Sequence, residues 1–311
     1  MTDILKNSKN SNTKNVFVPP MMHGVTASKV FLIPQAEHDT IFAFLCAHFP
    51  HIQTAEWQQR FDDGLVFDLS GEKLTRQTPY QSNQHIYYYR FLDNEIVVPF
   101  EHQIVFENDD LLVVDKPHFL TMTPTGQYVQ QTLLVRLKQQ TGNAELTPIH
   151  RLDRETVGIV LFSKRPETRG LYQQLFATRQ IEKIYHAIAP YLAELKFPIT
   201  TRYRMEKGQP FYTMQIVEGT VNSETDIDLL EHDQNWAKYR LYPKTGKQHQ
   251  LRVHLNALQI PIRHDPFYPV VAHKADDDFS QPLQLLAKAL HFYDPITKQE
   301  LRFESQNDLF L

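Results

Sequence analysis

The sequence predicts an α+β protein, in which a mixed, largely antiparallel sheet with flanking helices follows a small N-terminal module. From about residue 100, apolar strand patterns alternate with short amphipathic helix patterns, and residues 200–243 are typical of a meander of strands. Residues 38–76 have a different pattern, two helices and then a hairpin. We therefore expect a flexible tail and lead-in at 1–30, a small module at 31–99 and a large domain at 100–311.

The N-terminal module has three predicted elements. "TIFAFLCAHFP" (40–50) has helical apolar spacing, "AEWQQRFDDG" (55–64) indicates a second helix, and "LVFDLSGEKL" (65–74) indicates a hairpin about Ser70-Gly71. Their order resembles a degenerate S4-type RNA-binding module. Acidic side chains outnumber basic ones here, and a negative surface binds phosphate poorly, so we do not extend RNA binding to this module.

The large domain begins with a strand, a turn at Asn108-Asp109 and a second strand that stops at Pro117. A helix follows at 130–142, with Leu133, Leu134 and Leu137 on one face and Gly142 at its end. The remaining predicted elements are a strand from Val157 buried on both faces, a helix at 166–179, a strand at 183–191, and a helix at 247–259 with a seam of Leu251, Leu255 and Leu258.

Composition excludes several classes of protein. The chain of 311 residues is 41% hydrophobic and 22% charged, as is ordinary for a globular protein. The longest apolar run, 41–49, is far shorter than the ~18 residues that a membrane-spanning helix needs, and the N-terminus lacks the apolar region of a secretory signal. The one cysteine, Cys46, excludes an internal disulfide and a cysteine-based metal cluster. We expect a cytoplasmic protein with no membrane partner.

Charge is unevenly distributed along the chain. The formal net charge is −4, yet residues 238–254 hold five Lys and Arg side chains and no acid, whereas residues 218–233 hold six acids and no Lys or Arg. A chain of this kind can bind phosphates on one face while the rest stays soluble. On charge alone, basic segments that are merely solvated explain the pattern equally well.

The stretch "HRLDRETVG" (150–158) places Asp153 in a charged loop directly before the buried strand. Alone, such an aspartate indicates a turn or cap residue. However, "KIYHA" (183–187), "PKTGKQHQLRVHL" (243–255) and "PIRHDPFY" (261–268) follow in this order. Together the four motifs resemble the RluA-type pseudouridine synthases, over about residues 100–305.

This resemblance implies the pseudouridine synthase fold and an isomerase that breaks the N-glycosidic bond of a uridine in RNA, rotates the base and rejoins it through C5. It requires no cofactor. Asp153 matches the catalytic carboxylate, acting as a nucleophile or as a base that starts elimination at the ribose. Tyr185 matches the tyrosine that stacks on the extruded base. Arg252 matches the arginine that keeps Asp153 charged once RNA excludes water.

Further residues are expected to bind the substrate. Arg151 and Arg154 lie beside Asp153 and are expected to contact phosphate, while Lys183 is either structural or a phosphate contact. Lys247 and His249 belong to the motif that carries Arg252.

A metal site is not expected. On a helix, His249 and His254 diverge by about 140°, and neither Glu nor Cys completes a ligand set. We expect both histidines to form hydrogen bonds around the helix instead.

The chain departs from the common family pattern at several positions. Val157 stands where a serine is frequent, and Lys247 where an arginine is usual, which keeps the charge but loses bidentate phosphate binding. "HDPFYP" (264–269) replaces Gly-Asp-x-x-Tyr-Gly, and Phe119 lies near the glycine of a usual Lys-Pro-x-Gly-Leu. These changes put the choice of substrate in doubt, and not the activity.

We therefore expect a monomeric enzyme that isomerises uridines in structured RNA, tRNA or rRNA, with no obligatory protein partner. The main alternative is an RNA-binding protein of the same fold that has lost catalysis. A glycoside hydrolase that uses Asp153 and Glu155 is disfavoured, because the two carboxylates are neighbours in one loop and no separate second acid is evident.

Overall fold

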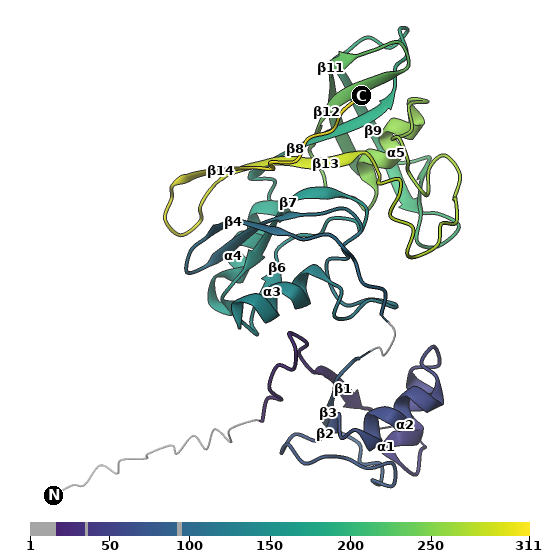
Figure 1. The fold of residues 1–311 in the computed structure, drawn as a ribbon, viewed down its shortest axis with the longest axis vertical. Helices are drawn as coiled ribbons and strands as arrows, with labels where there is room; N and C mark the ends of the chain where they lie inside the picture. The colour runs from purple at the N-terminus through teal and green to yellow at the C-terminus, as the bar shows by residue number, and fades with distance from the viewer. Residues whose placement is uncertain (1–16, 35–36, 92–94) are drawn as a thin grey trace, which may run out of the picture. The chain divides into compact units, whose positions relative to one another are not determined.

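The computed structural model describes residues 17–34, 37–91 and 95–311, and the chain forms two compact units, 1–91 and 92–311 (Figure 1). Residues 1–16 of the expected tail and lead-in at 1–30 lie outside the described residues. Within the described ranges, the helices are α1 (Ile41–His48), α2 (Thr54–Asp62), α3 (Leu133–Thr141), α4 (Pro166–Ala177) and α5 (Gln250–Ala257). None of them is long and apolar enough to cross a membrane.

The strands of the first unit are β1 (Ser28–Leu32), β2 (Val66–Phe67) and β3 (Gln84–Tyr88). The strands of the second unit are β4 (Gln103–Glu107), β5 (Leu111–Lys116), β6 (Thr147–Pro148), β7 (Val157–Ser163), β8 (Ile181–Pro190), β9 (Ile199–Lys207), β10 (Met214–Val217), β11 (Ser223–His232), β12 (Trp236–Pro243), β13 (Leu285–Tyr293) and β14 (Glu300–Glu304).

The first unit packs its two predicted helices on an antiparallel sheet of order β1-β3-β2. Leu45 of α1, Trp57 of α2 and Ile86 of β3 meet in its core. The predicted hairpin at 65–74 is present only in part. Its turn forms, but its second arm is reduced to a single bridge between Phe67 and Lys73, and β2 pairs with the distant β3 instead.

The second unit is built on one 11-stranded sheet. Nine of its strands follow the order β10-β9-β11-β12-β8-β13-β7-β5-β4, and the other two are β14, which pairs with β13, and β6, which pairs with β7. Only β7 and β13 run parallel among the strand pairs of residues 95–311. The prediction of a mixed, largely antiparallel sheet with flanking helices is therefore confirmed. The predicted helix at 130–142 is α3, which ends at Gly142 in the left-handed conformation with φ of 69°.

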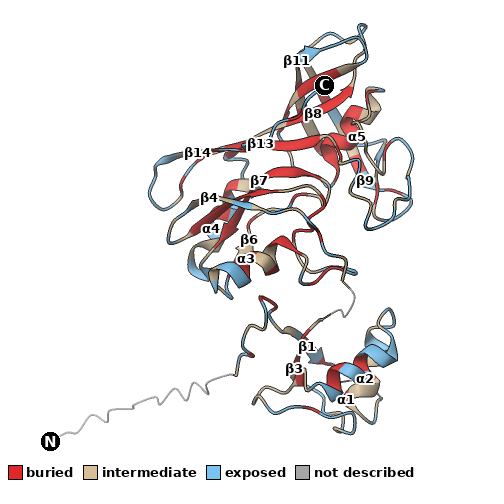
Figure 2. Cartoon of the chain, viewed as in Figure 1, coloured by how far each residue is buried: buried red, intermediate tan, exposed pale blue. Residues whose placement is uncertain are grey.

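Strand β7 is buried along its whole length, as Figure 2 shows. Val160 and Phe162 point into the core beneath α3, while Ile159 and Leu161 point into the core beneath α4. Side chains alternate between the faces of a strand, so a strand with a core on each side needs apolar residues at every position. The sequence prediction for this strand is confirmed.

Gly158 fixes how β7 meets its parallel neighbour. Its φ is +117°, a region that residues with a side chain rarely adopt, and a Cβ here would lie 2.3 Å from the carbonyl oxygen of Ala287 in β13. The close approach of the two strands therefore requires glycine at this position.

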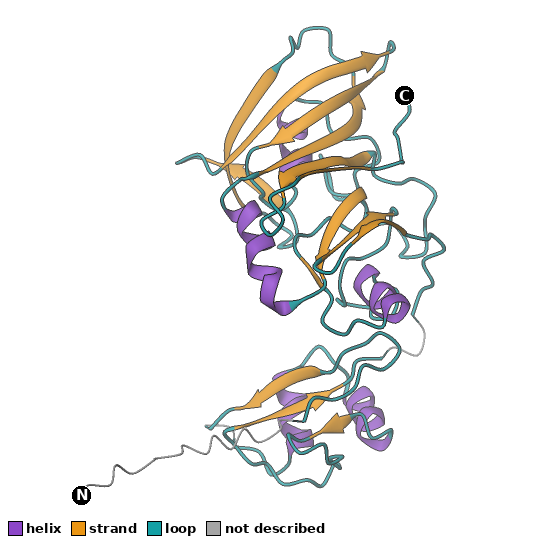
Figure 3. Cartoon of the chain, turned by 90° about the vertical axis from the view of Figure 1, so that its left-hand side faces the viewer, coloured by secondary structure: helices purple, strands orange, loops and turns teal. Residues whose placement is uncertain are grey.

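Helix α5 covers another part of the sheet through Leu251 and Leu255, which pack on Ala187 of β8 and Tyr239 of β12. In the view of Figure 3, the helices lie along the flanks of the sheet. The helix begins at Gln250 and not at Lys247 as expected, because residue 249 adopts a left-handed φ of 53°. His249 thus precedes the helix and does not share a helical face with Arg252.

Candidate active site

The loop between β6 and β7 is held by side chains from the end of β5. The Lys116 Nζ is fully buried and donates to the carbonyl oxygens of Arg154 at 2.9 Å, Pro117 and Leu120. His118 Nδ1 lies 2.7 Å from the Glu155 carbonyl oxygen. These bonds tie down the backbone just after Asp153, so its carboxylate stands on a fixed support.

Asp153 lies against Arg252 of α5. Arg252 Nη1 donates to Asp153 Oδ2 at 3.1 Å, across 99 positions of sequence. The contact expected from the motifs is present. The Asp153 side chain keeps 33% of its surface exposed, whereas that of Arg252 keeps 2%. A carboxylate open to solvent thus meets a cation that is enclosed by protein.

A second carboxylate, Asp265, holds the other edge of the same guanidinium. Its oxygens accept from Arg252 Nε at 2.8 Å and Nη2 at 2.6 Å, and Oδ1 also accepts from the backbone N–H groups of Phe267 and Tyr268. Burial lowers the pKa of Arg252, but the hydrogen bonds and charge of Asp265, with those of Asp153, raise it overall. The arginine therefore stays charged although it is buried.

His249 approaches Asp153 from the turn before α5. Its Nε2 lies 3.8 Å from Asp153 Oδ2, beyond hydrogen-bond distance, and its Nδ1 lies 2.9 Å from the Tyr268 hydroxyl. Burial lowers the pKa of His249, and the negative charge of Asp153 only partly offsets this decrease. The neutral imidazole is therefore favoured at neutral pH.

His254, the other histidine of the motif, lies in the protein interior. Its Nδ1 lies 2.7 Å from Thr201 Oγ1 and its Nε2 lies 2.9 Å from Ser223 Oγ. Both motif histidines therefore form hydrogen bonds, as predicted. Across residues 17–34, 37–91 and 95–311, no group of three or more His, Cys, Asp or Glu side chains is placed to hold a metal ion.

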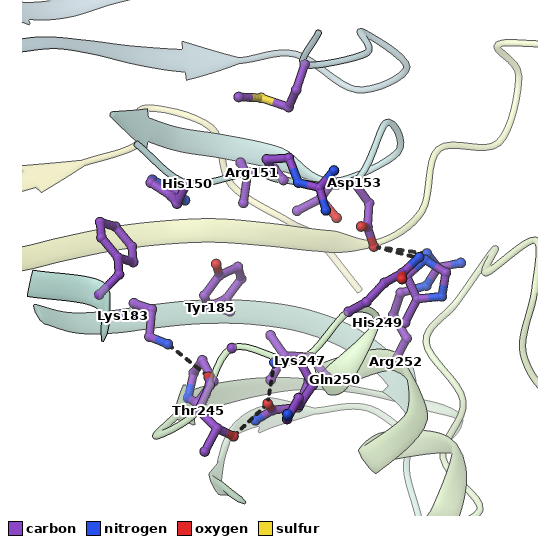
Figure 4. Close-up of a pocket in the computed structure, with 18 of the residues that line it drawn as sticks. His150, Arg151, Asp153, Lys183, Tyr185, Thr245, Lys247, His249, Gln250 and Arg252 are labelled. Atoms are coloured by element: carbon purple, nitrogen blue, oxygen red, sulfur yellow. Dashed lines mark hydrogen bonds and ion pairs between the residues drawn. The ribbon is translucent and has the colours of Figure 1, made fainter. Parts of the chain in front are cut away.

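Tyr185 of β8 lies where two cores meet, because it packs against both the core beneath α3 and the core beneath α5. Burial, and then the charge of Asp153, raise the pKa of its phenol, so the hydroxyl is protonated at neutral pH. In Figure 4 its ring lies in the pocket between Asp153 and Lys183.

Lys183 and Gln250 shape the basic loop before α5. Lys183 Nζ donates to the Thr245 carbonyl oxygen at 2.9 Å, and Gln250 Oε1 accepts from Thr245 Oγ1 at 2.7 Å and from the Lys247 N–H at 3.1 Å (Figure 4). Burial, and then the charge of Arg179, lower the pKa of Lys183 to about 8. Of the two predicted lysines, Lys183 supports the loop and Lys247 is exposed on it.

The two arginines of the Asp153 loop differ in their surroundings. Arg151 is exposed. Arg154 pairs with Glu155 at 3.2 Å and donates to the Tyr128 hydroxyl and to the carbonyl oxygen of Asp276. These contacts fix the Arg154 side chain at the cleft, and its contact with RNA stays a prediction.

One cleft of about 1170 Å³ brings together every predicted site residue: Arg151, Asp153, Arg154, Lys183, Tyr185, Lys247, His249 and Arg252. A smaller cavity of about 400 Å³ shares Asp153, Arg154, His249 and Arg252 with it. Sequence reasoning missed two supporting residues, Lys116 and Asp265. Asp265 stands in the quoted "HDPFYP", and Lys116 directly precedes Pro117, where the second predicted strand stops. Neither pattern indicated the contacts that these side chains make.

Comparisons with known proteins identify the relatives of this chain. The family described as RNA pseudouridylate synthase matches residues 110–257. A dual-specificity RNA pseudouridine synthase RluA of Pasteurella multocida is 30% identical over 216 residues, which cover 65% of this chain and 91% of that protein. A mitochondrial tRNA pseudouridine(32) synthase of Saccharomyces cerevisiae is 30% identical over 53% of this chain and 37% of that protein.

The solved structure of human RNA pseudouridylate synthase domain containing 1 has the same fold, with a TM-score of 0.54 and 23% identity over 67% of this chain and 84% of that one. The fold, the ordered motifs and the extended identity to RluA enzymes agree. This chain is a member of the RluA-type family of RNA pseudouridine synthases, which are isomerases that act on RNA.

Proposed function

We propose that this enzyme converts specific uridines of structured tRNA or rRNA to pseudouridine, with Asp153 as the catalytic carboxylate. The observation that carries the proposal is the way in which Asp153 is held. Arg252 and His249 both approach its Oδ2, while Oδ1 has no hydrogen-bond partner among the described residues. One oxygen is thus anchored by a buried cation and the other is available to the substrate.

Arg252 keeps the carboxylate charged when bound RNA excludes water, because a neighbouring cation favours the ionised form. Asp265 contributes by fixing the guanidinium so that Nη1 alone turns to Asp153. Oδ1 then acts either as the nucleophile or as the base that starts elimination at the ribose.

Tyr185 stacks on the uracil that leaves the RNA helix. Extrusion of a base costs a few kcal/mol of lost stacking, and an aromatic ring replaces part of that loss. The position of its ring in the cleft, near Asp153, supports this role. Arg151, Arg154, Lys183, Lys247 and His249 line the same cleft and form the surface for the RNA backbone.

Tritium release tests the reaction. Bulk RNA labelled with tritium at uridine C5 is incubated with the wild-type protein, because joining C5 to the ribose displaces the hydrogen on C5. We expect release by the wild type and none by Asp153→Asn or Asp153→Ala, with circular dichroism confirming that the variants fold. If the wild type binds tRNA and rRNA transcripts but releases no tritium from either, the chain is an RNA-binding protein that lacks catalysis.

The target uridine is found separately, by comparing pseudouridine maps of RNA from cells with and without the gene. Tyr185→Phe and Tyr185→Leu distinguish stacking from a role of the hydroxyl. If the ring acts by stacking, the phenylalanine variant retains most of the activity and the leucine variant loses most of it.

A further inference from the structure

The turn between β9 and β10 presents an aromatic side chain to solvent. Phe211 lies in this turn and is 76% exposed. The ring belongs to none of the buried cores of the second unit. Packing in these cores therefore does not require a phenylalanine at this position, and aromatic side chains are enriched at binding interfaces.

The turn that carries Phe211 is rigid. Gly208 N–H donates to the Thr213 carbonyl oxygen at 3.0 Å, and both the N–H and the hydroxyl of Thr213 donate to the Pro210 carbonyl oxygen, at 2.8 and 2.7 Å. A Cβ at residue 208 would lie 2.6 Å from Thr213 Oγ1, so glycine is needed for the turn to close. A rigid turn loses little entropy when its exposed ring binds a partner.

A series of ring contacts leads from this turn to the catalytic site. Phe211 meets Tyr212 with ring centroids 5.6 Å apart, and Tyr212 meets Phe267 at 5.2 Å. The Arg252 guanidinium lies 4.8 Å from the Phe267 ring, and its other side binds Asp153. The ring contacts therefore lead from Phe211 to the smaller cavity, which Tyr212 and Phe267 line and which shares Arg252 with the cleft. The β9–β10 turn lies beside the loop that follows α5 (Figure 1).

Hydrogen bonds join the turn to the same basic loop. Lys207 Nζ donates to Gln248 Oε1 at 3.1 Å, and Gln248 Nε2 donates to the Tyr212 carbonyl oxygen at 3.4 Å. Gln248 and Lys247 line the cleft, and Lys207 is exposed beside the turn. Cations thus stand next to an exposed ring at the rim, which is how proteins bind single-stranded RNA.

We propose that Phe211 is a stacking site for an unpaired base of the substrate RNA, outside the catalytic pocket that receives the uridine. The inference rests on the proposed function. The neighbouring lysines and the ring contacts that lead toward the cleft favour RNA over a protein or a lipid surface as the occupant. Stacking is tolerant of base identity, so the site adds affinity and places the RNA without reading its sequence.

The test compares Phe211→Ala and Phe211→Trp with Phe310→Ala in the full-length protein. Phe310 is the matched control, since it is 78% exposed and follows Leu309, which packs on Ile188. Ile188 and Tyr185 are three residues apart on β8 and face opposite sides of the sheet. Binding of bulk tRNA and of rRNA fragments is titrated, and tritium release gives kcat and KM.

We expect Phe211→Ala to weaken RNA binding about 5- to 100-fold through KM, with kcat at saturating RNA little changed. Phe211→Trp should bind at least as well as the wild type, and Phe310→Ala should be unchanged. The dependence of binding on salt should be the same for Phe211→Ala and the wild type, because no charge is lost.

The inference is overturned if Phe211→Ala binds RNA as well as the wild type, or if Phe310→Ala is equally weakened. A wild-type protein that binds no RNA overturns both this inference and the proposed function. If the wild type releases no tritium but its RNA binding still depends on an aromatic ring at 211, the stacking site stands and only the proposed function fails.

Discussion

Arg252 and Asp265 form a buried two-bonded ion pair, with Nε to Oδ2 at 2.8 Å and Nη2 to Oδ1 at 2.6 Å. The Asp265 side chain is completely buried. Such a pair fixes the plane of a guanidinium, because both bonds must be made at once. In this protein it leaves a single nitrogen, Nη1, for Asp153, so Asp265 sets the direction from which the Asp153 carboxylate is held.

Asp265→Asn should therefore lower both stability and turnover. The amide still occupies the site but removes the charge opposite Arg252, and breaking a buried pair costs about 3–5 kcal/mol. A guanidinium that is misplaced by about 1 Å lowers kcat about 100-fold. Urea unfolding and tritium release measure the two effects.

Asp294→Asn is the matched control for this variant. Asp294 is also buried, and it accepts from the Tyr172 hydroxyl and from two backbone N–H groups in the turn between β13 and β14, which does not line the cleft. We expect it to lower stability while kcat stays normal. An equal loss of kcat in both variants would show that Asp265 acts only through stability.

Acid should destabilise the fold through its buried histidines. Burial lowers the pKa of His254 to about 4 from an ordinary value of 6.5, and burial likewise lowers the pKa of His118 to about 4. Between these values the unfolded chain binds protons that the folded chain does not, so the free energy of unfolding falls as the pH drops from 6.5 to 4. Urea titrations at several pH values should show this decrease.

His254→Gln isolates one part of the acid effect. The amide can still bond to Thr201 or Ser223 but does not titrate. We expect the variant to be less stable than the wild type at pH 7, yet to lose less stability between pH 6.5 and 4. A parallel pH dependence in the two proteins would contradict the assignment to His254.

Phe119 combines an unfavourable backbone with a favourable side chain. Its backbone has a φ of +63°, and the common family pattern has a glycine near this position. Its side chain is 2% exposed, and its ring packs against the rings of Phe100 and Phe279. Relief of the backbone strain gains about 1 kcal/mol, whereas loss of a buried phenylalanine costs about 3–5 kcal/mol. Phe119→Gly should therefore be less stable than the wild type, despite the glycine in the relatives' pattern.

Phe119→Ala separates the two contributions at this position. Alanine loses the ring and keeps the strain, so the order of stability should be Phe, then Gly, then Ala, with about 1 kcal/mol between the last two. Chemical denaturation measures all three proteins. An alanine variant more stable than the glycine variant would refute the claim of strain.

Lys247 should contribute to RNA affinity through charge. It is exposed on the basic loop at the rim of the cleft. Lys247→Ala should reduce the slope of log affinity against log salt by about 0.7–0.9, as expected for one lost phosphate contact. Lys298→Ala, at an exposed lysine in the turn between β13 and β14, should leave the slope unchanged. Filter binding over a range of salt would disprove the contact if both slopes equal that of the wild type.

The local parts of this fold could be predicted because they depend on nearby residues. The unbroken run of apolar residues in β7 predicts a strand that is buried on both faces. Gly142 predicts the end of α3, because glycine readily adopts the left-handed φ found there. The predicted start of α5 at Lys247 was wrong, because a side-chain contact determines where this helix begins. Gln250 bonds to Thr245 and to the Lys247 N–H, which makes residues 247–249 a turn in place of helix.

Contacts between site residues that lie far apart in the sequence could be predicted only where both residues belong to recognised motifs. Arg252 and Asp153 are 99 positions apart, and no periodicity brings them together; the ordered motifs did. The motifs left the supporting contacts open. A lysine at the end of an apolar strand is usually exposed, yet the Lys116 side chain turns inward, where its Nζ donates to three carbonyl oxygens.

Gly158 has a consequence for the tolerance of this chain to insertions. Since only glycine fits against Ala287, and the residues that follow it alternate between two different cores, β7 cannot slide to absorb a change in loop length. The position of Asp153 is therefore set by Gly158, which follows it by five residues and is itself fixed in the sheet. In this enzyme the length of the loop between Asp153 and β7 is therefore constrained as strictly as the sequence of β7 itself.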